Sequence, residues 1–360
     1  MSATRQALFW LVTLTLFFLL LHLLSGMLLP FVAAFGIAYL LAPLVALLAR
    51  WNLPRGLASL AALLLFILLL AAVIVLIVPV VELQAAQLAR SAPAFAGYIR
   101  GEAQRLLDLA QQQLPPEDMQ KARDMVGGWT GAALGWVAGL VEGVLTSGLA
   151  IANILTLLLI TPLVAFFLLR DWPALVARLD SWLPRPYAPT IREQLRLVDQ
   201  TISGYIHGQA LVSLINGVYY AVALSIVGLN FAFIIGLVVG IVSFIPYVGE
   251  IIGVVLAVGL AAVQFGTWGK IIVVVAIFIC GNLVSGNLLQ PKLIGERVHL
   301  HQVWVIFALL AFGTLFGFVG VLLALPAAAV TGVLVRFALG RYLASPLYDP
   351  GPERRGGEGA

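Results

Sequence analysis

Glu250 is the residue whose type and setting point most directly to chemistry. It is the only acidic residue between Asp199 and Glu296, and it follows the sequence Ile245-Pro246-Tyr247-Val248-Gly249 in an apolar stretch. A carboxylate at membrane depth is costly unless it is paired, protonated or hydrated, so this residue is a candidate for ion coupling. At the membrane surface it would be an ordinary interfacial charge, and the sequence leaves both interpretations open.

A line of polar side chains precedes this stretch. Steps of four, three and four residues place its members on one face of a helix, and the members are Gln209, Ser213, Asn216 and Tyr220. Such side chains can hold helices together, or they can line a transport path. The pattern fits both interpretations.

A second polar group lies in the apolar run 271–289 and just after it, and consists of Asn282, Asn287 and Gln290. The spacing of eight between the first and the last puts them on one helix face, while the middle residue points elsewhere. Pro291 is expected to end this helix and expose its last carbonyl groups, which Lys292 or a bound cation could satisfy. Snorkelling alone explains the lysine, but it does not explain two asparagines in an apolar span.

An interruption in the apolar segment 231–263 would position Glu250. Proline removes a backbone donor and glycine adopts any φ, so we expect the helix to break at Pro246 and Gly249, next to Tyr247. Each half is shorter than the ~20 residues that span hydrocarbon, which favours a hairpin or a broken helix. Backbone groups freed by the break must be satisfied by protein or water, which favours a solute site there.

A second interrupted segment, 303–337, repeats this arrangement. Its breaks are expected at Gly317, Gly320 and Pro326. A full span precedes each interruption, and the two units would be inverted relative to one another. Paired interruptions in corresponding positions of two halves are typical of secondary transporters.

Composition places these elements in a membrane. Hydrophobic residues make up 62% of the chain and charged residues 10%, whereas soluble domains carry about 25% charged residues. The net charge of +4 is spread over the loops, which argues against a nucleic-acid surface. The single cysteine, Cys280, cannot form an internal disulfide. We therefore expect an all-α polytopic membrane protein with two broken or re-entrant hairpins in its C-terminal half.

Five regions follow from the distribution of apolar and polar residues. They are N-terminal membrane spans in 1–81, an extramembrane amphipathic helical region in 82–143, a fourth span with connecting helices in 144–207, a transport region in 208–341, and a disordered tail in 342–360. Arginines concentrate in the loops on one side, so the positive-inside rule predicts that both termini are cytoplasmic.

The order of motifs after Gly204 resembles that of the autoinducer-2 exporter family, the PerM-like permeases. The motifs are Pro246-Tyr247-Val248-Gly249, Gly286-Asn287-Leu288-Leu289-Gln290-Pro291-Lys292-Leu293-Ile294-Gly295, Val298-His299-Leu300-His301 and Phe316-Gly317-Phe318-Val319-Gly320. The resemblance implies about eight membrane segments in a bacterial inner membrane and a homo-oligomer such as a pentamer. It also implies export of a small signalling molecule or another small solute, and some relatives resemble sodium/proton antiporters.

Other chemistries lack their motifs. There is no phosphate-binding Gly-x-x-x-x-Gly-Lys-Ser/Thr loop and no His-Glu-x-x-His pair, and His299 and His301 fit an interfacial connection better than a metal site. We expect no enzyme activity, cofactor or metal.

The working hypothesis is a secondary transporter with alternating access. Glu250 would couple H+ or Na+, and the two polar groups with Tyr247 would contact the solute. A passive channel and a membrane scaffold without flux remain the rival interpretations.

Overall fold

The computed structural model describes residues 27–113, 115–145, 151–265, 267–294 and 301–345, together with isolated positions within 8–24 and residue 348. These residues are almost entirely helical, and no strand occurs among them. Six helices are long and apolar enough to cross a membrane, and two shorter apolar helices accompany them. The prediction of an all-α polytopic membrane protein is confirmed. Half of the predicted first span, 7–24, and most of the tail, 342–360, lie outside the described residues.

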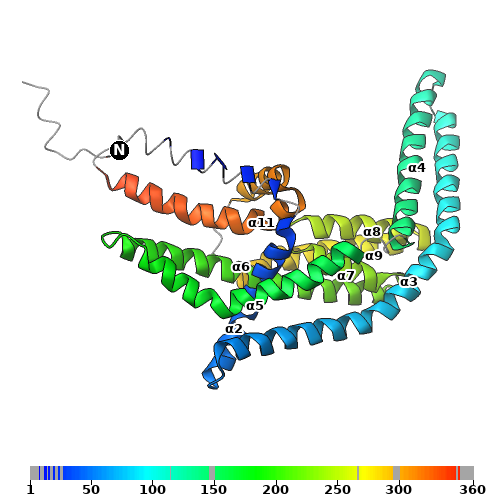
Figure 1. Ribbon diagram of the computed structural model, residues 1–360. Helices are drawn as coiled ribbons and strands as arrows, with labels where there is room; N and C mark the ends of the chain where they lie inside the picture. The colour runs from blue at the N-terminus through cyan, green and yellow to red at the C-terminus, as the bar shows by residue number, and fades with distance from the viewer. Residues whose placement is uncertain are drawn as a thin grey trace, which may run out of the picture. The chain divides into compact units, whose positions relative to one another are not determined.

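The described part of the first half contains four long helices (Figure 1), which are α2 (Leu28–Arg50), α3 (Arg55–Gln113), α4 (Pro116–Leu145) and α5 (Ile151–Ser181). The 59 residues of α3 correspond to a length of about 90 Å at 1.5 Å per residue. Only its part Arg55–Val80 has the composition of a membrane span. The helix therefore continues without interruption from the predicted third span into the predicted extramembrane region.

The helix of the fourth span continues beyond its apolar run. The sequence Arg170-Asp171-Trp172-Pro173 places charges and a proline after that run, which favour the end of a helix, but α5 continues through it to Ser181. Local compensation explains the difference. Arg170 Nε donates to Asp171 Oδ1 at 2.7 Å, so the two charges satisfy each other at the helix surface.

The second half contains α6 (Ala188–Ile226), α7 (Ala232–Val242), α8 (Val248–Phe265), α9 (Trp268–Val284), the π-helical turn η3 (Ser285–Leu289), α10 (Gln290–Leu293) and α11 (Gln302–Leu343). The chain divides into two compact units. Unit 1 comprises Met1–Leu65, Thr156–Val212 and Gly286–Ala360, and unit 2 comprises Phe66–Leu155 and Ser213–Ser285. We describe each unit by itself.

Unit 2 has a continuous apolar core in which α8 packs against both α7 and α9 (Figure 1). The buried side chains of this core are Tyr220, Leu224, Leu229, Ala232, Ile235, Val239, Ala257, Ala261, Val274 and Phe278. Small residues allow α6 and α7 to approach closely, as is typical of membrane helices. A Cβ atom on Gly240 would lie 2.9 Å from the Cα of Gly217 on α6.

The interruption between α7 and α8 covers residues 243–247 and contains Pro246. We expected Gly249 to supply the unusual backbone conformation. Instead Tyr247 adopts it, with φ of 66°, and Gly249 lies within the first turn of α8. Gly249 is needed for space, because a Cβ atom there would lie 2.5 Å from the backbone nitrogen of Ser243.

We expected Pro291 to end the helix that begins with α9, but the helical chain continues past this residue. It passes through η3 and then through α10, which contains Pro291 and ends at Leu293. A π-turn shifts the backbone hydrogen-bond partners by one residue, so it can accommodate the donor that proline lacks. The shift also breaks the regular spacing on which the shared face of Asn282 and Gln290 was predicted.

In unit 1, α11 packs against α2. It is bent at Gly317, whose φ of 60° and ψ of −140° are not helical. The bend brings Gly320 against the carbonyl oxygen of Phe312, where a side chain would have no space. Pro326, which we expected to act as a structural break, lies instead in the helical part of α11 beyond the bend.

Candidate functional site

The polar line on α6 belongs mainly to the interior of its helix contacts. Gln209, in unit 1, and Asn216, in unit 2, are each 4% exposed. Ser213 is half-buried, and its Oγ has no hydrogen-bond partner among the residues that the structure describes. Tyr220 is fully buried.

Asn216 connects α6 to the π-turn. Its Nδ2 donates to Ser285 Oγ at 3.2 Å, and both residues are buried in unit 2. This pair supports the interpretation in which polar residues hold membrane helices together. The partner could not be inferred from the sequence, because the two residues are separated by 69 positions.

Tyr220 lies where α6 meets α9. Its ring stacks on Phe278 with centroids 4.4 Å apart, and its hydroxyl lies against Gly281. Neighbouring Tyr219 donates its hydroxyl to the carbonyl of Ile277 at 3.0 Å. The Tyr220 hydroxyl has no such partner among the described residues.

Glu250 has a specific partner next to this contact. It lies in the first turn of α8, where the partial positive charge of a helix N-terminus favours an anion. Its Oε2 accepts a hydrogen bond from Asn282 Nδ2 on α9. Glu250 is half-buried, and none of the ion pairs between described residues includes it. The carboxylate is therefore held by a neutral amide, and it can gain or lose a proton without breaking an ion pair.

The remaining predicted residues do not join this cluster. Tyr247 is 45% exposed in the interruption of unit 2. Asn287 and Gln290 are exposed on unit 1, in η3 and α10. His301 caps α11, because its Nδ1 accepts from the backbone nitrogen of Val303 at 3.3 Å, while His299 lies outside the described residues. No cluster of three or more metal-ligand side chains occurs among the residues searched. In unit 2, the structure pairs Glu250 with Asn282, and Asn282 follows Gly281, against which the Tyr220 hydroxyl lies.

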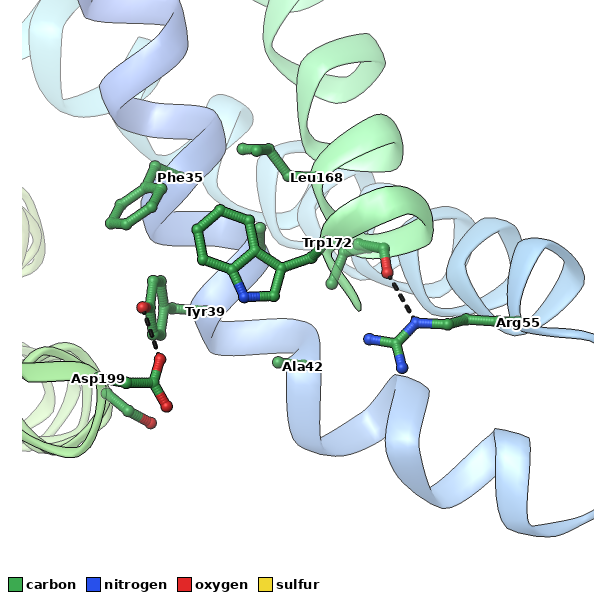
Figure 2. Close-up of a pocket in the computed structure, with 10 residues that line it drawn as sticks. Phe35, Tyr39, Ala42, Arg55, Leu168, Trp172 and Asp199 are labelled. Atoms are coloured by element: carbon green, nitrogen blue, oxygen red, sulfur yellow. Dashed lines mark hydrogen bonds between the residues drawn. The ribbon is translucent and has the colours of Figure 1, made fainter. Parts of the chain in front are cut away.

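Sequence reasoning missed a pocket in unit 1 (Figure 2). It has a volume of about 200 Å³ and lies between α2, the start of α3, α5 and α6. The lining residues are Phe35, Ala38, Tyr39, Ala42, Arg55, Leu168, Leu169, Trp172, Asp199 and Ser203. Tyr39 donates its hydroxyl to Asp199 Oδ1 at 2.8 Å across 160 positions of sequence. No local pattern indicates a contact over such a separation.

Two prolines are the one sequence signal near this pocket. Pro173 follows Leu169 by four residues in α5, so the Leu169 carbonyl lacks the N–H that a helix would normally supply. Arg55 Nε donates to that carbonyl at 3.1 Å. Pro43 stands in the same relation to Tyr39 in α2. Helices that contain proline therefore border the pocket, and an arginine satisfies one of the carbonyl groups that lack a helical donor.

Comparison with known proteins places this geometry in context. A model of the AI-2E family of transporters matches residues 9–340. YrrI of Bacillus subtilis (strain 168) is 32% identical over 330 residues, which cover 91% of this chain and 88% of the relative. TqsA, an AI-2 transport protein of Escherichia coli (strain K12), is 26% identical, with 89% of each chain covered. PerM of the same organism is 27% identical over 86% of this chain and 87% of its own.

Proposed function

The chain belongs to the AI-2E transporter family and acts in membrane transport, and on that premise we propose that it exports a small polar solute by coupling to an ion gradient. The solute would be an autoinducer-2-like signal or another small molecule. The coupling ion would be H+ or Na+. As a protein of a transporter family rather than of an enzyme family, it would change the position of the solute and not its bonds.

The observation that carries the proposal is the pair of Glu250 and Asn282 in unit 2. A carboxylate in an apolar layer is stable when it is protonated, hydrated or paired. Here its partner is a neutral amide, which can donate to the charged form and accept from the protonated form after a rotation. The pair therefore supports a reversible proton site next to the Tyr220 hydroxyl.

Conformational change would use the interruptions of the chain. Interrupted helices near the middle of the membrane are where secondary transporters bind solutes. The α7–α8 interruption adjoins Glu250, and α11 is bent at Gly317, where the backbone leaves the helical conformation. In the proposed cycle, protonation of Glu250 alters its bond to Asn282 and so favours one of two access states.

Orientation and assembly are part of the same proposal. The arginine-rich segments support cytoplasmic termini in a bacterial inner membrane. Gln290 is exposed in a helical segment that is otherwise suited to hydrocarbon, and a second copy of the chain could cover it. We therefore propose a homo-oligomer, such as a pentamer, which the mass of the detergent-solubilised particle tests.

Vesicle flux tests the function directly. The purified chain is reconstituted, a proton gradient is imposed, and movement of labelled autoinducer-2 is measured with and without a protonophore. We expect saturable flux that the protonophore collapses, and loss of gradient-driven flux in the Glu250→Gln variant. Glu193→Gln is the matched control, because it removes an exposed carboxylate of α6 that pairs with Arg196.

Two results would contradict the proposal. Unchanged gradient-driven flux in correctly assembled Glu250→Gln would remove this residue from the coupling mechanism. Linear flux without counterflow would indicate a passive channel instead of a carrier.

A further inference from the structure

The pocket in unit 1 contains chemistry that the proposed transport cycle does not use. It combines a carboxylate, a guanidinium and three aromatic rings in about 200 Å³ (Figure 2). Small-molecule sites of drug size occupy roughly 300–1,000 Å³. This pocket therefore suits a ligand of the size of an amino acid.

One end of the pocket suits a cation. Tyr39 fixes Asp199 by donating to Oδ1 at 2.8 Å, and this bond leaves Oδ2 for a ligand. Phe35 packs edge to face on Tyr39, with centroids 4.8 Å apart at 62°, and on Trp172, with centroids 6.3 Å apart at 71°. Figure 2 shows Asp199 beside Tyr39, with Phe35 and Trp172 near that tyrosine. Aromatic faces next to a carboxylate are a recurring site for ammonium groups.

The other end suits an anion. Arg55 uses its Nε–H on the Leu169 carbonyl, and the four N–H donors of its terminal nitrogens remain. A guanidinium presents these donors in a plane that matches carboxylate and phosphate oxygens. None of the ion pairs between described residues includes Arg55 or Asp199. The pocket thus has the negative charge of Asp199 at one end and the positive charge of Arg55 at the other, with Trp172 between them (Figure 2).

We propose that this pocket is a binding site for a small zwitterion. The ammonium end lies against Asp199 and the aromatic corner, and the acid end binds Arg55. This chemistry occurs in free amino acids and phosphoethanolamine, and also in the headgroup of an ethanolamine phospholipid. The site stands independently of the flux proposed above, because equilibrium binding does not require transport.

Equilibrium binding to the purified full chain in detergent tests the site. The probes are phosphoethanolamine and 4-aminobutyrate as zwitterions, choline as a cation and acetate as an anion, and calorimetry measures each. We expect both zwitterions to bind, and the singly charged probes to bind about ten-fold or more weakly, because each loses one charge-assisted contact. Choline bound as tightly as phosphoethanolamine would overturn the proposal.

Variants separate binding from folding. Asp199→Asn should weaken phosphoethanolamine binding about ten-fold or more, since a charged hydrogen bond becomes a neutral one. Tyr39→Phe should weaken it less, because it only releases the carboxylate. Glu193→Gln is the control, as its charge lies on α6 outside the pocket. Elution as a monodisperse particle verifies folding, and undiminished binding by both folded pocket variants would contradict the assignment.

Nanodiscs distinguish the two sources of the ligand. Phosphoethanolamine binding is compared in discs of phosphatidylethanolamine and discs of phosphatidylglycerol. Binding seen only in phosphatidylglycerol means that the lipid headgroup fills the pocket, and equal binding in both means that a free solute does. Absence of binding in both would overturn the proposal. The Glu250→Gln variant should keep this binding even where it loses flux, which separates failure of one proposal from failure of the other.

Discussion

The α7–α9 layer of unit 2 and the α2–α5 corner of unit 1 differ in how they satisfy the polar groups within apolar helices. In the α7–α9 layer, a continuous apolar core forms around small residues, and the polar groups are held by neutral partners such as Asn282. In the α2–α5 corner, α2 and α5 each contain a proline that removes a backbone donor, and a charged side chain satisfies one of the carbonyl groups left without that donor.

The difference indicates what each region can do. The described contact of the Glu250 carboxylate is its hydrogen bond from Asn282, so a substitution of Glu250 acts first on this pair. The pocket at Asp199 is already formed, so a ligand of suitable size needs no rearrangement of a core to bind there. We therefore expect substitutions in the first region to alter stability or coupling, and substitutions in the second to alter binding.

Gly236 offers the largest test of this contrast. A Cβ atom there would overlap the backbone of Ala221 on α6, which cannot move as a flexible side chain would. Gly236→Ala should destabilise the protein by about 1–3 kcal/mol, the usual range for overpacking. Unfolding in detergent, followed by loss of helical circular dichroism, measures the change.

Gly259 on α8 provides the matched control. A Cβ atom there would meet nothing within 4 Å, so Gly259→Ala should stabilise the helix by roughly 0.5–1 kcal/mol. Equal effects of the two substitutions would show that the α6–α7 contact does not limit the stability of unit 2.

Arg55 and Pro173 test the second region with a smaller expected effect. Arg55→Met keeps the apolar stem but leaves the Leu169 carbonyl without its donor, which should cost about 1 kcal/mol. Pro173→Ala restores an N–H four residues after Leu169, so in that background the arginine substitution should cost almost nothing. Unfolding of the four proteins of this cycle measures the coupling, and additive effects would show that Arg55 does not compensate for the proline.

Features that depend on residues close in sequence could be predicted, and these are the helices and the approximate position of one break. Apolar runs and their lengths predict the helices, and Pro246 predicts the region in which α7 ends and α8 begins. The backbone conformation within the break was not predicted correctly, because Tyr247 and not Gly249 has the positive φ. The helix also continues through Pro291, because a π-turn precedes it.

Partners between helices could not be predicted, because they depend on which helices meet. Glu250 and Asn282 were both candidates, yet nothing in the sequence pairs residues 32 positions apart. In the same way, nothing in the sequence pairs Asp199 with Tyr39, which lies 160 positions away. The polar residues of the α7–α9 layer were identifiable by their rarity in apolar segments. The pocket was not, because its charges lie in segments where charges are common.

The bond between Asn216 and Ser285 tests whether polar pairing adds much to a region held by apolar packing. A double-mutant cycle of Asn216→Ala and Ser285→Ala should give a coupling free energy of about 0.6 kcal/mol, the average for hydrogen bonds between membrane helices. The value should be small because the unfolded chain in detergent also finds partners for these groups. Reversible unfolding of the four proteins measures it. A coupling well above that of Arg55 with Pro173 would reverse the contrast, since polar pairing and not close packing would then dominate in unit 2.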